Sequence, residues 1–192
     1  YYQYATAWPI GTLLAQTWDI DQIYAYGEGV GEEMEEFGIG CWLAPGMNIH
    51  RNALCGRNFE YYSEDPYAAS EIATAHIEGV QSQNVGTSIK HFCLNNQETR
   101  RMSISAEVDE RTMHEIYLSA FEGAVKNAKP WTVMCSYNRI NGVFGSENQE
   151  TLTDILRKRW GYEGFVVSDW SAVNDRAVSY THLRAHETKA NL

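Results

Sequence analysis

Short apolar runs alternate along this chain with longer segments in which apolar residues recur every three or four positions. The apolar runs are too short for helices, and we predict buried strands at 41–44, 87–92, 131–135 and 164–167. The longer segments predict helices at 20–37, 66–84, 110–127 and 147–159, with a further short helix at 10–16. Strands that alternate with helices are typical of βαβ units and a parallel sheet.

Residues that favour helix ends stand where these helices begin and stop. Asp19 is placed to cap the helix at 20–37 and Gly38 to end it, while Asp109 precedes the helix at 110–127. Ser146 with Gln149 resembles a capping box for the last helix. The apolar positions that we expect on buried helix faces are Ile72, Ile77, Val80, Ile116, Leu118, Phe121 and Val125.

Each predicted strand is followed by a loop that is richer in polar and aromatic residues than the turn before the strand. The loop at 47–65 is long, and loops of that length inside a domain are usually functional. In β/α barrels the loops after the strands share one face, which holds the reacting groups. Four helix–strand units make about half of an eight-unit barrel. The predicted fold class is therefore α/β, a partial (β/α)8 TIM-like barrel that is truncated at both ends.

The residues after the strands would collect donors and acceptors at one mouth. Asp169 follows the strand at 164–167, and Trp170 beside it offers a flat apolar face for a sugar ring. An Asp that merely caps the next turn is an equal alternative when Asp169 is taken alone. Such a dense set of donors and acceptors suits a ligand rich in hydroxyl groups. The set is Arg57, Glu64, Asp65, Lys90, His91, Asn96, Glu98, Arg101, Tyr137, Asn138, Asp169 and Trp170.

Two members of this set have structural alternatives of comparable weight. Arg57 could form a purely structural ion pair with Glu60 or Glu64, and Tyr137 could serve packing alone. His182 and His186 have a spacing that suits a metal on a helix, but no Glu follows His182 as in the HExxH pattern, so we expect no metal. Glycine-rich nucleotide motifs are missing as well, and we expect no cofactor.

Charge and composition narrow the class of partner. The 192 residues have a formal charge of −10, which argues against nucleic acid and against an anionic membrane surface. No apolar run reaches the ~18 residues of a membrane span. The four cysteines form no CxxC pair, which favours reduced core thiols and a cytoplasmic location. The chain does not begin with Met, and an upstream signal peptide is therefore an open alternative.

Several motifs follow one another along the chain: LAPGMNIHR at 43–51, GRNFEYYSEDP at 56–66, KHF at 90–92 with NQE at 96–98, VMCSYN at 133–138 and SDW at 168–170. Their order and spacing are more specific than any one of them. Taken together, over about residues 8–176, they resemble glycoside hydrolase family 3, of the bacterial β-glucosidase type.

The resemblance implies an N-terminal (β/α)8-type barrel that is followed, in the same chain, by an α/β sandwich domain. It implies that Asp169 is the nucleophile of a retaining mechanism, that Tyr137 lies beside it and that Trp170 forms the adjacent wall. The positions that match the family's sugar-binding residues next to the scissile bond are Arg57, Lys90, His91 and Arg101.

The implied substrate is a small-molecule carbohydrate with terminal β-linked glucose. A β-xylosidase or another exo-glycosidase of the same family, and a non-catalytic carbohydrate-binding barrel, are the alternatives. The family usually takes its acid/base from a Glu in the second domain. We therefore expect the chain as given to hydrolyse ordinary glycosides poorly or not at all.

The resemblance ends near Ala177. Residues 178–192 resemble translated sequencing-adaptor read-through instead. We therefore divide the chain into a barrel domain at 1–177 and a tail at 178–192, and we expect the tail to be foreign to the fold and disordered or loosely helical.

Overall fold

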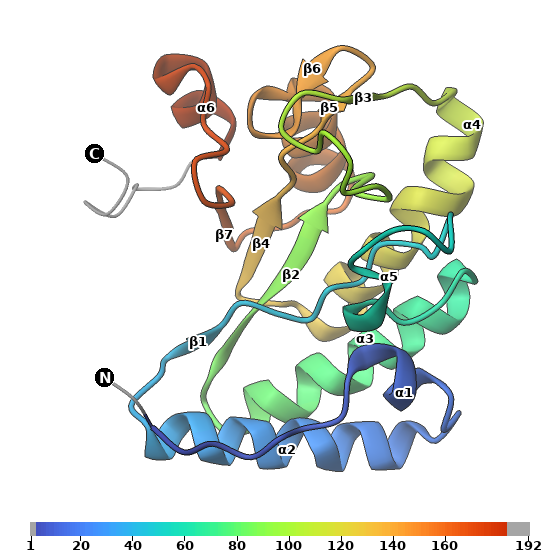
Figure 1. Cartoon of the computed structure of the whole chain (residues 1–192). Helices are drawn as coiled ribbons and strands as arrows, with labels where there is room; N and C mark the ends of the chain where they lie inside the picture. Colours follow the sequence, from blue (N-terminus) through green and yellow to red (C-terminus); the bar gives the residue numbers. More distant parts are fainter. Residues whose placement is uncertain (1–2, 184–192) are drawn as a thin grey trace.

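A parallel sheet lies at the centre of the computed structural model, which describes residues 3–183 (Figure 1). Within these residues its strands lie in the order β1 (Cys41–Trp42), β2 (Gly86–Phe92), β4 (Thr132–Cys135) and β7 (Phe165–Val167). All three neighbouring pairs are parallel. The predicted α/β class is confirmed, and the arrangement is that of a partial (β/α)8 barrel with β1 and β7 at its two edges.

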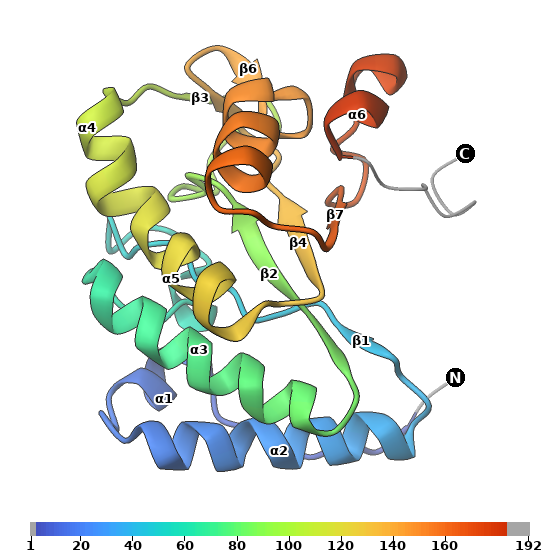
Figure 2. The same ribbon diagram turned by 180° about the vertical axis from the view of Figure 1, so that it is seen from behind.

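Three long helices cover one side of this sheet, where Figure 2 shows them one after another. They are α2 (Ile20–Glu36), α3 (Pro66–Ser82) and α5 (Ser119–Ala128), with α3 packed against both of the others. The other helical segments are α1 (Gly11–Ala15), η1 (Asn58–Glu60), α4 (Glu110–Thr112), η2 (Met113–Leu118), η3 (Gly145–Glu147), η4 (Glu150–Arg159) and α6 (Arg176–Leu183).

Aspartates begin the main helices, as the sequence predicts. Asp19 accepts a hydrogen bond from the Gln22 amide at 3.0 Å, and Asp109 accepts one from Thr112 at 3.0 Å. Gly38 follows α2 with a φ of +68°, a left-handed conformation that glycine adopts without strain. These caps satisfy amides that have no partner inside the helix.

Helices α2 and α3 touch through glycines. A Cβ placed on Gly79 would lie 2.2 Å from the carbonyl oxygen of Tyr24 and 3.0 Å from the Cα of Gly27. No side chain fits between the two backbones at this point, so both positions require glycine. The close approach lets α2 pack directly against α3, which also contacts β2.

The buried helix faces follow the prediction except at one position. Ile72, Ile77 and Val80 are buried on α3. On the next helix Phe121 packs edge-to-face on Phe92 of β2, with their centroids 5.3 Å apart. The correction is Ile116, which is 36% exposed. It lies in the π-helical stretch η2, whose wider turns rotate the following side chains relative to a regular α-helix.

The segment after β4 differs from the prediction. A hairpin of β5 (Arg139–Ile140) and β6 (Val143–Phe144) pairs with β3 (Ser105–Ala106) in a second small sheet. The expected capping box is wrong, because Ser146 lies in the turn η3 and donates to the carbonyl oxygen of Ala172 at 2.8 Å. Asn148 caps this helix instead, since its Oδ1 accepts from the Thr151 amide at 2.9 Å.

The predicted tail is described only in part. Helix α6 extends to Leu183, and the Asp175 carboxylate accepts hydrogen bonds from the amides of Ala177 and Val178 at its start. The remainder of the predicted tail, including His186, lies outside the described residues. Among residues 3–183 no helix is long and apolar enough to cross a membrane.

Candidate functional site

Asp169 lies two residues beyond β7, at the carboxyl end of the parallel sheet. Its side chain is buried, and its Oδ1 accepts a hydrogen bond from the Trp170 amide at 2.8 Å. The other carboxylate oxygen, Oδ2, has no hydrogen-bond partner among the described residues. The turn-capping alternative therefore accounts for one oxygen only. Trp170 is 67% exposed, so its indole forms an open surface beside the carboxylate.

Arg57 and Lys90 share one carboxylate. Glu60 binds Arg57 through Oε1, and its Oε2 lies 3.3 Å from the Nζ of Lys90. Burial alone would lower the pKa of Arg57, but the hydrogen bond and charge of Glu60 outweigh it, and the pKa is raised. Of the two ion pairs considered for Arg57, the structure contains the one with Glu60; Glu64 is exposed.

The His91 ring lies between Tyr61 and Asp169. Its Nε2 lies 3.7 Å from Oδ2 of Asp169, and its Nδ1 lies 3.0 Å from the hydroxyl of Tyr61. Burial lowers the pKa of His91 well below its usual value, and the charges of Arg57, Lys90 and Arg101 lower it further. The imidazole is therefore neutral at physiological pH, and its contact with Asp169 is not an ion pair.

Arg101 reaches the same site from the loop after β2. Its guanidinium carbon lies 4.8 Å from the centre of the Tyr137 ring, a cation–π distance, and its Nη1 donates to Oε2 of Glu98 at 2.8 Å. Burial and the charge of Asp169 raise the pKa of Tyr137 to about 12, although Arg101 and Arg57 act in the opposite direction. Tyr137 thus remains a neutral donor beside Asp169.

A buried link closes the cluster on its far side. Nδ2 of Asn95 donates to the hydroxyl of Tyr61 at 3.0 Å and to Oε1 of Glu98 at 3.0 Å. Contacts therefore run from Asp169 through His91, Tyr61, Asn95 and Glu98 to Arg101, and return through Tyr137. Sequence reasoning missed Tyr61 and Asn95, although both lie within or beside the motifs at 56–66 and 96–98.

Other expected members of the mouth have structural roles. Asp65 caps α3 by accepting from Tyr67 and Ala68. Asn96 donates to the Ile49 carbonyl at 2.5 Å, and Asn138 donates to the carbonyl of Cys93 at 3.3 Å. These amides tie the loops after β1, β2 and β4 to one another. They fix the loops from which Arg57, Arg101 and Tyr137 project.

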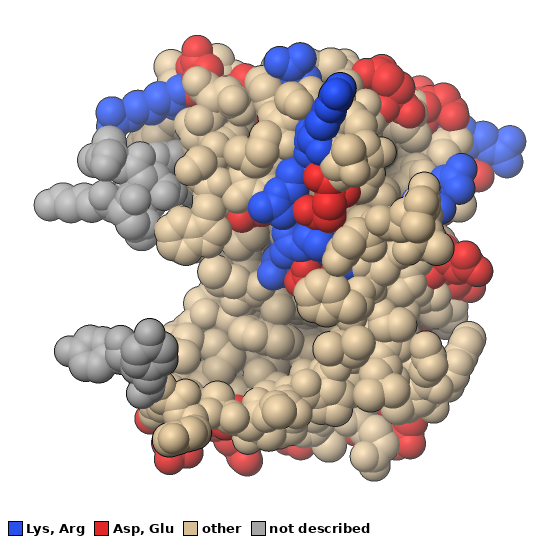
Figure 3. Space-filling model, in the orientation of Figure 1, with Lys and Arg blue, Asp and Glu red and all other residues tan. Residues whose placement is uncertain are grey.

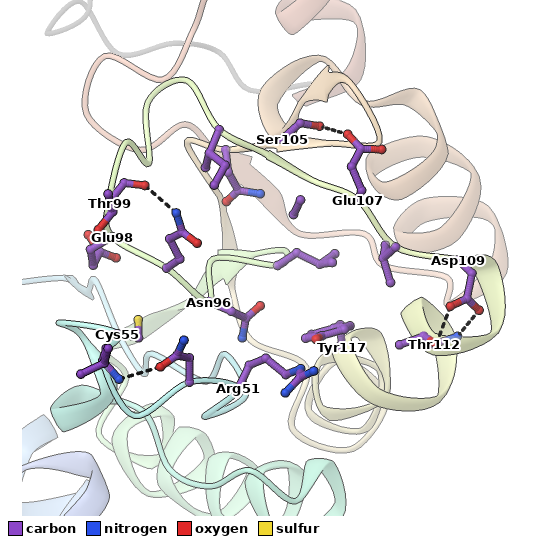
Figure 4. A pocket seen from close by; sticks show the side chains of 18 residues that line it. Arg51, Cys55, Asn96, Glu98, Thr99, Ser105, Glu107, Asp109, Thr112 and Tyr117 are labelled. Carbon is purple, nitrogen blue, oxygen red and sulfur yellow. Dashed lines mark hydrogen bonds between the residues drawn. The ribbon is translucent and has the colours of Figure 1, made fainter.

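A separate cavity of about 810 Å³ opens next to this cluster (Figure 4). Glu98 lines it, but none of the seven residues predicted to bind or react with substrate does. Several polar groups in its wall are paired with one another, such as Ser105 with Glu107 and Thr112 with Asp109. This cavity is therefore distinct from the cluster of side chains around Asp169.

Charged side chains of both signs meet near the middle of the face seen in Figure 3 and are surrounded mostly by uncharged residues. Within the described part of the chain, no group of three or more His, Cys, Asp or Glu side chains could hold a metal ion. The four cysteines are free, and burial raises the pKa of Cys135 to about 12, so this thiol is protonated at neutral pH.

Comparison with known proteins gives consistent matches over most of the chain. The family model "Glycosyl hydrolase family 3 N terminal domain" matches residues 2–191. The thermostable β-glucosidase B of Acetivibrio thermocellus is 55% identical over 172 residues, and the exo-α-(1→6)-L-arabinopyranosidase of Bifidobacterium longum is 51% identical over 175 residues. These alignments cover 90% and 91% of this chain.

The fold agrees with that of a solved relative. The structure of β-glucosidase 3B from Thermotoga neapolitana in complex with glucose has a TM-score of 0.93 and 51% identity, over 94% of this chain and 25% of that chain. The chain also spans 23% of the length of the two enzymes named above. It therefore corresponds to about a quarter of these relatives.

Proposed function

The chain belongs to the glycosyl hydrolase family 3 N-terminal domains, and from this premise we propose that it forms the nucleophile-bearing part of a retaining, exo-acting β-glucosidase. Asp169 is the proposed nucleophile. The observation that carries the proposal is that Oδ2 of Asp169 has no hydrogen-bond partner among the described residues, although this residue is only 6% exposed and lies at the end of a parallel strand. A buried carboxylate oxygen without a partner is costly unless the site uses it.

The surrounding side chains suit a sugar next to this oxygen. Lys90, Arg57 and Arg101 supply cationic donors for hydroxyl groups, and Trp170 supplies an exposed flat ring. In the proposed reaction Oδ2 attacks the anomeric carbon, the bond to the leaving oxygen breaks, and a covalent glycosyl-enzyme forms. Water then hydrolyses this ester with a second inversion, so the sugar keeps its configuration.

The leaving oxygen of an ordinary glycoside needs a proton, and neither nearby glutamate is suited to give one. Glu60 pairs with Arg57 and Lys90, and Glu98 pairs with Arg101, so both carboxylates are already engaged with cations. We propose that the general acid belongs to a part of the protein beyond the quarter that this chain matches. The chain by itself would then hydrolyse unactivated glycosides poorly, since a general acid contributes typically ~10²–10⁴-fold.

A second candidate is an exo-arabinopyranosidase. The Bifidobacterium longum relative is named for that activity and is nearly as similar to this chain as the β-glucosidase of Acetivibrio thermocellus. The same nucleophile and the same steps would serve both reactions. The test is the rate of dinitrophenolate release from dinitrophenyl β-glucoside, β-xyloside and α-L-arabinopyranoside. The preferred substrate distinguishes the two candidates from each other and from a β-xylosidase.

The test of the proposal is covalent trapping. The chain is incubated with a dinitrophenyl 2-deoxy-2-fluoro-β-glucoside, whose leaving group departs without protonation and whose fluorine slows hydrolysis of the adduct. We expect the intact mass to increase by one fluoroglucosyl group, on the peptide that contains Asp169. Asp169→Asn should abolish the increase, and the matched control Asp175→Asn should keep it.

The alternative outcomes are informative because folding is measured in parallel by circular dichroism. A folded chain that is not labelled contradicts the proposed nucleophile and favours a carbohydrate-binding barrel. Label on a peptide without Asp169 would overturn the assignment of Asp169 while keeping a covalent mechanism.

A further inference from the structure

We infer that Tyr61 and Asn95 are positioning residues that fix His91 as the neutral tautomer protonated on Nε2, with its N–H facing Asp169. The use of this N–H toward a sugar rests on the proposed function, but the tautomer itself does not. The inference follows the chain of hydrogen bonds inward from Glu98, whose charge determines the direction of each bond.

The orientation of the Asn95 amide is set by Glu98. A carboxylate in an ion pair can only accept hydrogen bonds, and Glu98 forms such a pair with Arg101 at 2.8 Å. The atom of Asn95 that lies 3.0 Å from Oε1 of Glu98 must therefore be the amide nitrogen. The same nitrogen lies 3.0 Å from the Tyr61 oxygen. Since Nδ2 has two protons and no acceptor capacity, Tyr61 accepts from Asn95.

The proton of the Tyr61 hydroxyl then has one destination. Tyr61 is 0% exposed, so its hydroxyl cannot turn to bulk solvent. The other hydrogen-bond partner of its hydroxyl among the described residues is Nδ1 of His91, at 3.0 Å. A buried hydroxyl that donates to nothing is destabilising, and Nδ1 must therefore accept. Burial also raises the pKa of Tyr61, so the hydroxyl retains its proton. Nδ1 of His91 is consequently unprotonated.

The opposite side of the imidazole leads to the same tautomer. Nε2 of His91 faces the carboxylate oxygen Oδ2 of Asp169 at 3.7 Å. A bare nitrogen lone pair would repel that oxygen, whereas an N–H is attracted to it. Protonation of both nitrogens is disfavoured by burial and by the nearby charges of Arg57, Lys90 and Arg101.

This arrangement matters for the nucleophile. The N–H of His91 supports the charge of Asp169, yet 3.7 Å is longer than a hydrogen bond, so Oδ2 is not held by it. In the proposed reaction the same N–H would donate to a sugar hydroxyl oxygen, and His91 would not act as a base at Nε2. Tyr61 and Asn95 contact neither Asp169 nor the proposed sugar, and they act only through His91.

The tautomer is measurable by NMR without any turnover. Long-range ¹H–¹⁵N spectra of the ¹⁵N-labelled chain distinguish a ring protonated on Nε2 from one protonated on Nδ1, and His91→Gln identifies the His91 signals by their loss. We expect a neutral Nε2–H ring throughout pH 5–8. A ring protonated on Nδ1, or a cationic ring in this range, would overturn the inference.

Two substitutions test the positioning role. In Tyr61→Phe the Nδ1 signal should move toward that of a nitrogen without a hydrogen bond. The matched control is Tyr62→Phe, because Tyr62 is also buried and its hydroxyl lies 2.6 Å from Nδ1 of another histidine, His76. Tyr62→Phe should alter the His76 signals and leave those of His91 unchanged. His91 signals that ignore Tyr61→Phe would contradict the role of Tyr61.

Asn95→Asp is nearly isosteric and provides the reverse test if Tyr61→Phe does not fold. Its new oxygen presents lone pairs to Tyr61 whether or not the carboxyl is protonated, so the Tyr61 proton should turn toward it. His91 should then move to the Nδ1–H form and donate to Tyr61. An unchanged Nε2–H ring in folded Asn95→Asp would show that Asn95 does not set the tautomer.

Covalent trapping adds a functional readout. Tyr61→Phe should lower the rate of fluoroglucosyl labelling by about tenfold, which corresponds to one lost hydrogen bond, while Tyr62→Phe should label at the wild-type rate. If the wild-type chain is folded but is not labelled, the proposed function fails, and the NMR result still decides the tautomer.

Discussion

Asn48 pairs with the backbone of His91 from both directions. Its Oδ1 accepts from the His91 amide at 2.7 Å, and its Nδ2 donates to the His91 carbonyl oxygen at 3.0 Å. Just before it, Met47 and Lys90 are joined by a backbone hydrogen bond of 2.8 Å. The Asn48 side chain therefore continues the pairing between the chain after β1 and β2 by one more residue, and it holds His91 where the regular ladder ends.

We expect Asn48→Asp to destabilise the chain. The new carboxylate can accept from the His91 amide but faces the His91 carbonyl oxygen without a proton, at a site that is buried. The unfolding free energy should fall by about 1–3 kcal/mol, measured by urea denaturation. Asn52→Asp is the control, because Asn52 is exposed and its side-chain oxygen accepts from the Leu54 amide, a bond that a carboxylate oxygen keeps. Equal stability of the two variants would contradict this role of Asn48.

We expect Glu60 to affect substrate binding, although it is not among the residues predicted to contact the sugar. Glu60→Gln removes the charge that holds Arg57 and Lys90 near each other, so both cations should lose their fixed positions. We expect the rate of covalent labelling at low substrate concentration to fall by about tenfold. Glu64→Gln, at an exposed position in the same loop, should keep the wild-type rate; a similar loss in both variants would count against specific positioning.

The parts of the fold that the sequence predicts are those determined locally. Asp19 and Asp109 cap helices through amides three residues away, so their roles are visible in the sequence. The strands follow from apolar runs, and their parallel order follows from the helices between them. The hairpin of β5 and β6 also has a local signal that our prediction missed, because an Asn-Gly pair is strongly associated with two-residue hairpin turns. In the structure Asn141 and Gly142 adopt the positive φ angles of such a turn, 47° and 89°.

The candidate site shows where sequence reasoning stops. Motif resemblance indicates residues such as His91 and Asp169, but it does not indicate which side chains hold them. Tyr61 and His91 are 30 positions apart, and their hydrogen bond exists because the loop before α3 folds over the end of β2. The prediction that Ile116 is buried is wrong for a related reason, because no residue pattern in the sequence indicates the π-helical turns that expose it.

The division of the chain near Ala177 stays a prediction, and truncation tests it. If residues 178–192 are foreign to the fold, a chain ending at Ala177 should have the same unfolding free energy as the full chain, within about 0.5 kcal/mol. The measurement is urea denaturation followed by circular dichroism. A clear loss of stability would mean that helix α6, which packs near η3 and β7, belongs to the fold.

His76 should make the chain less stable in acid. It is buried between the rings of Tyr26 and Trp42, and burial lowers its pKa from 6.5 to about 3. The folded state thus keeps this ring neutral at pH values where the unfolded chain binds a proton. Its contribution to stability is complete above pH 6.5 and is lost as pH falls from 6.5 toward 3, with a slope of up to about 1.4 kcal/mol per pH unit.

His76→Gln cannot bind that proton, so its unfolding free energy, measured by urea denaturation from pH 7 to pH 4, should fall less steeply than that of the wild type. Because carboxylates titrate alike in both proteins, the difference in slope isolates His76, and parallel curves would show that its ring is not held neutral by the fold.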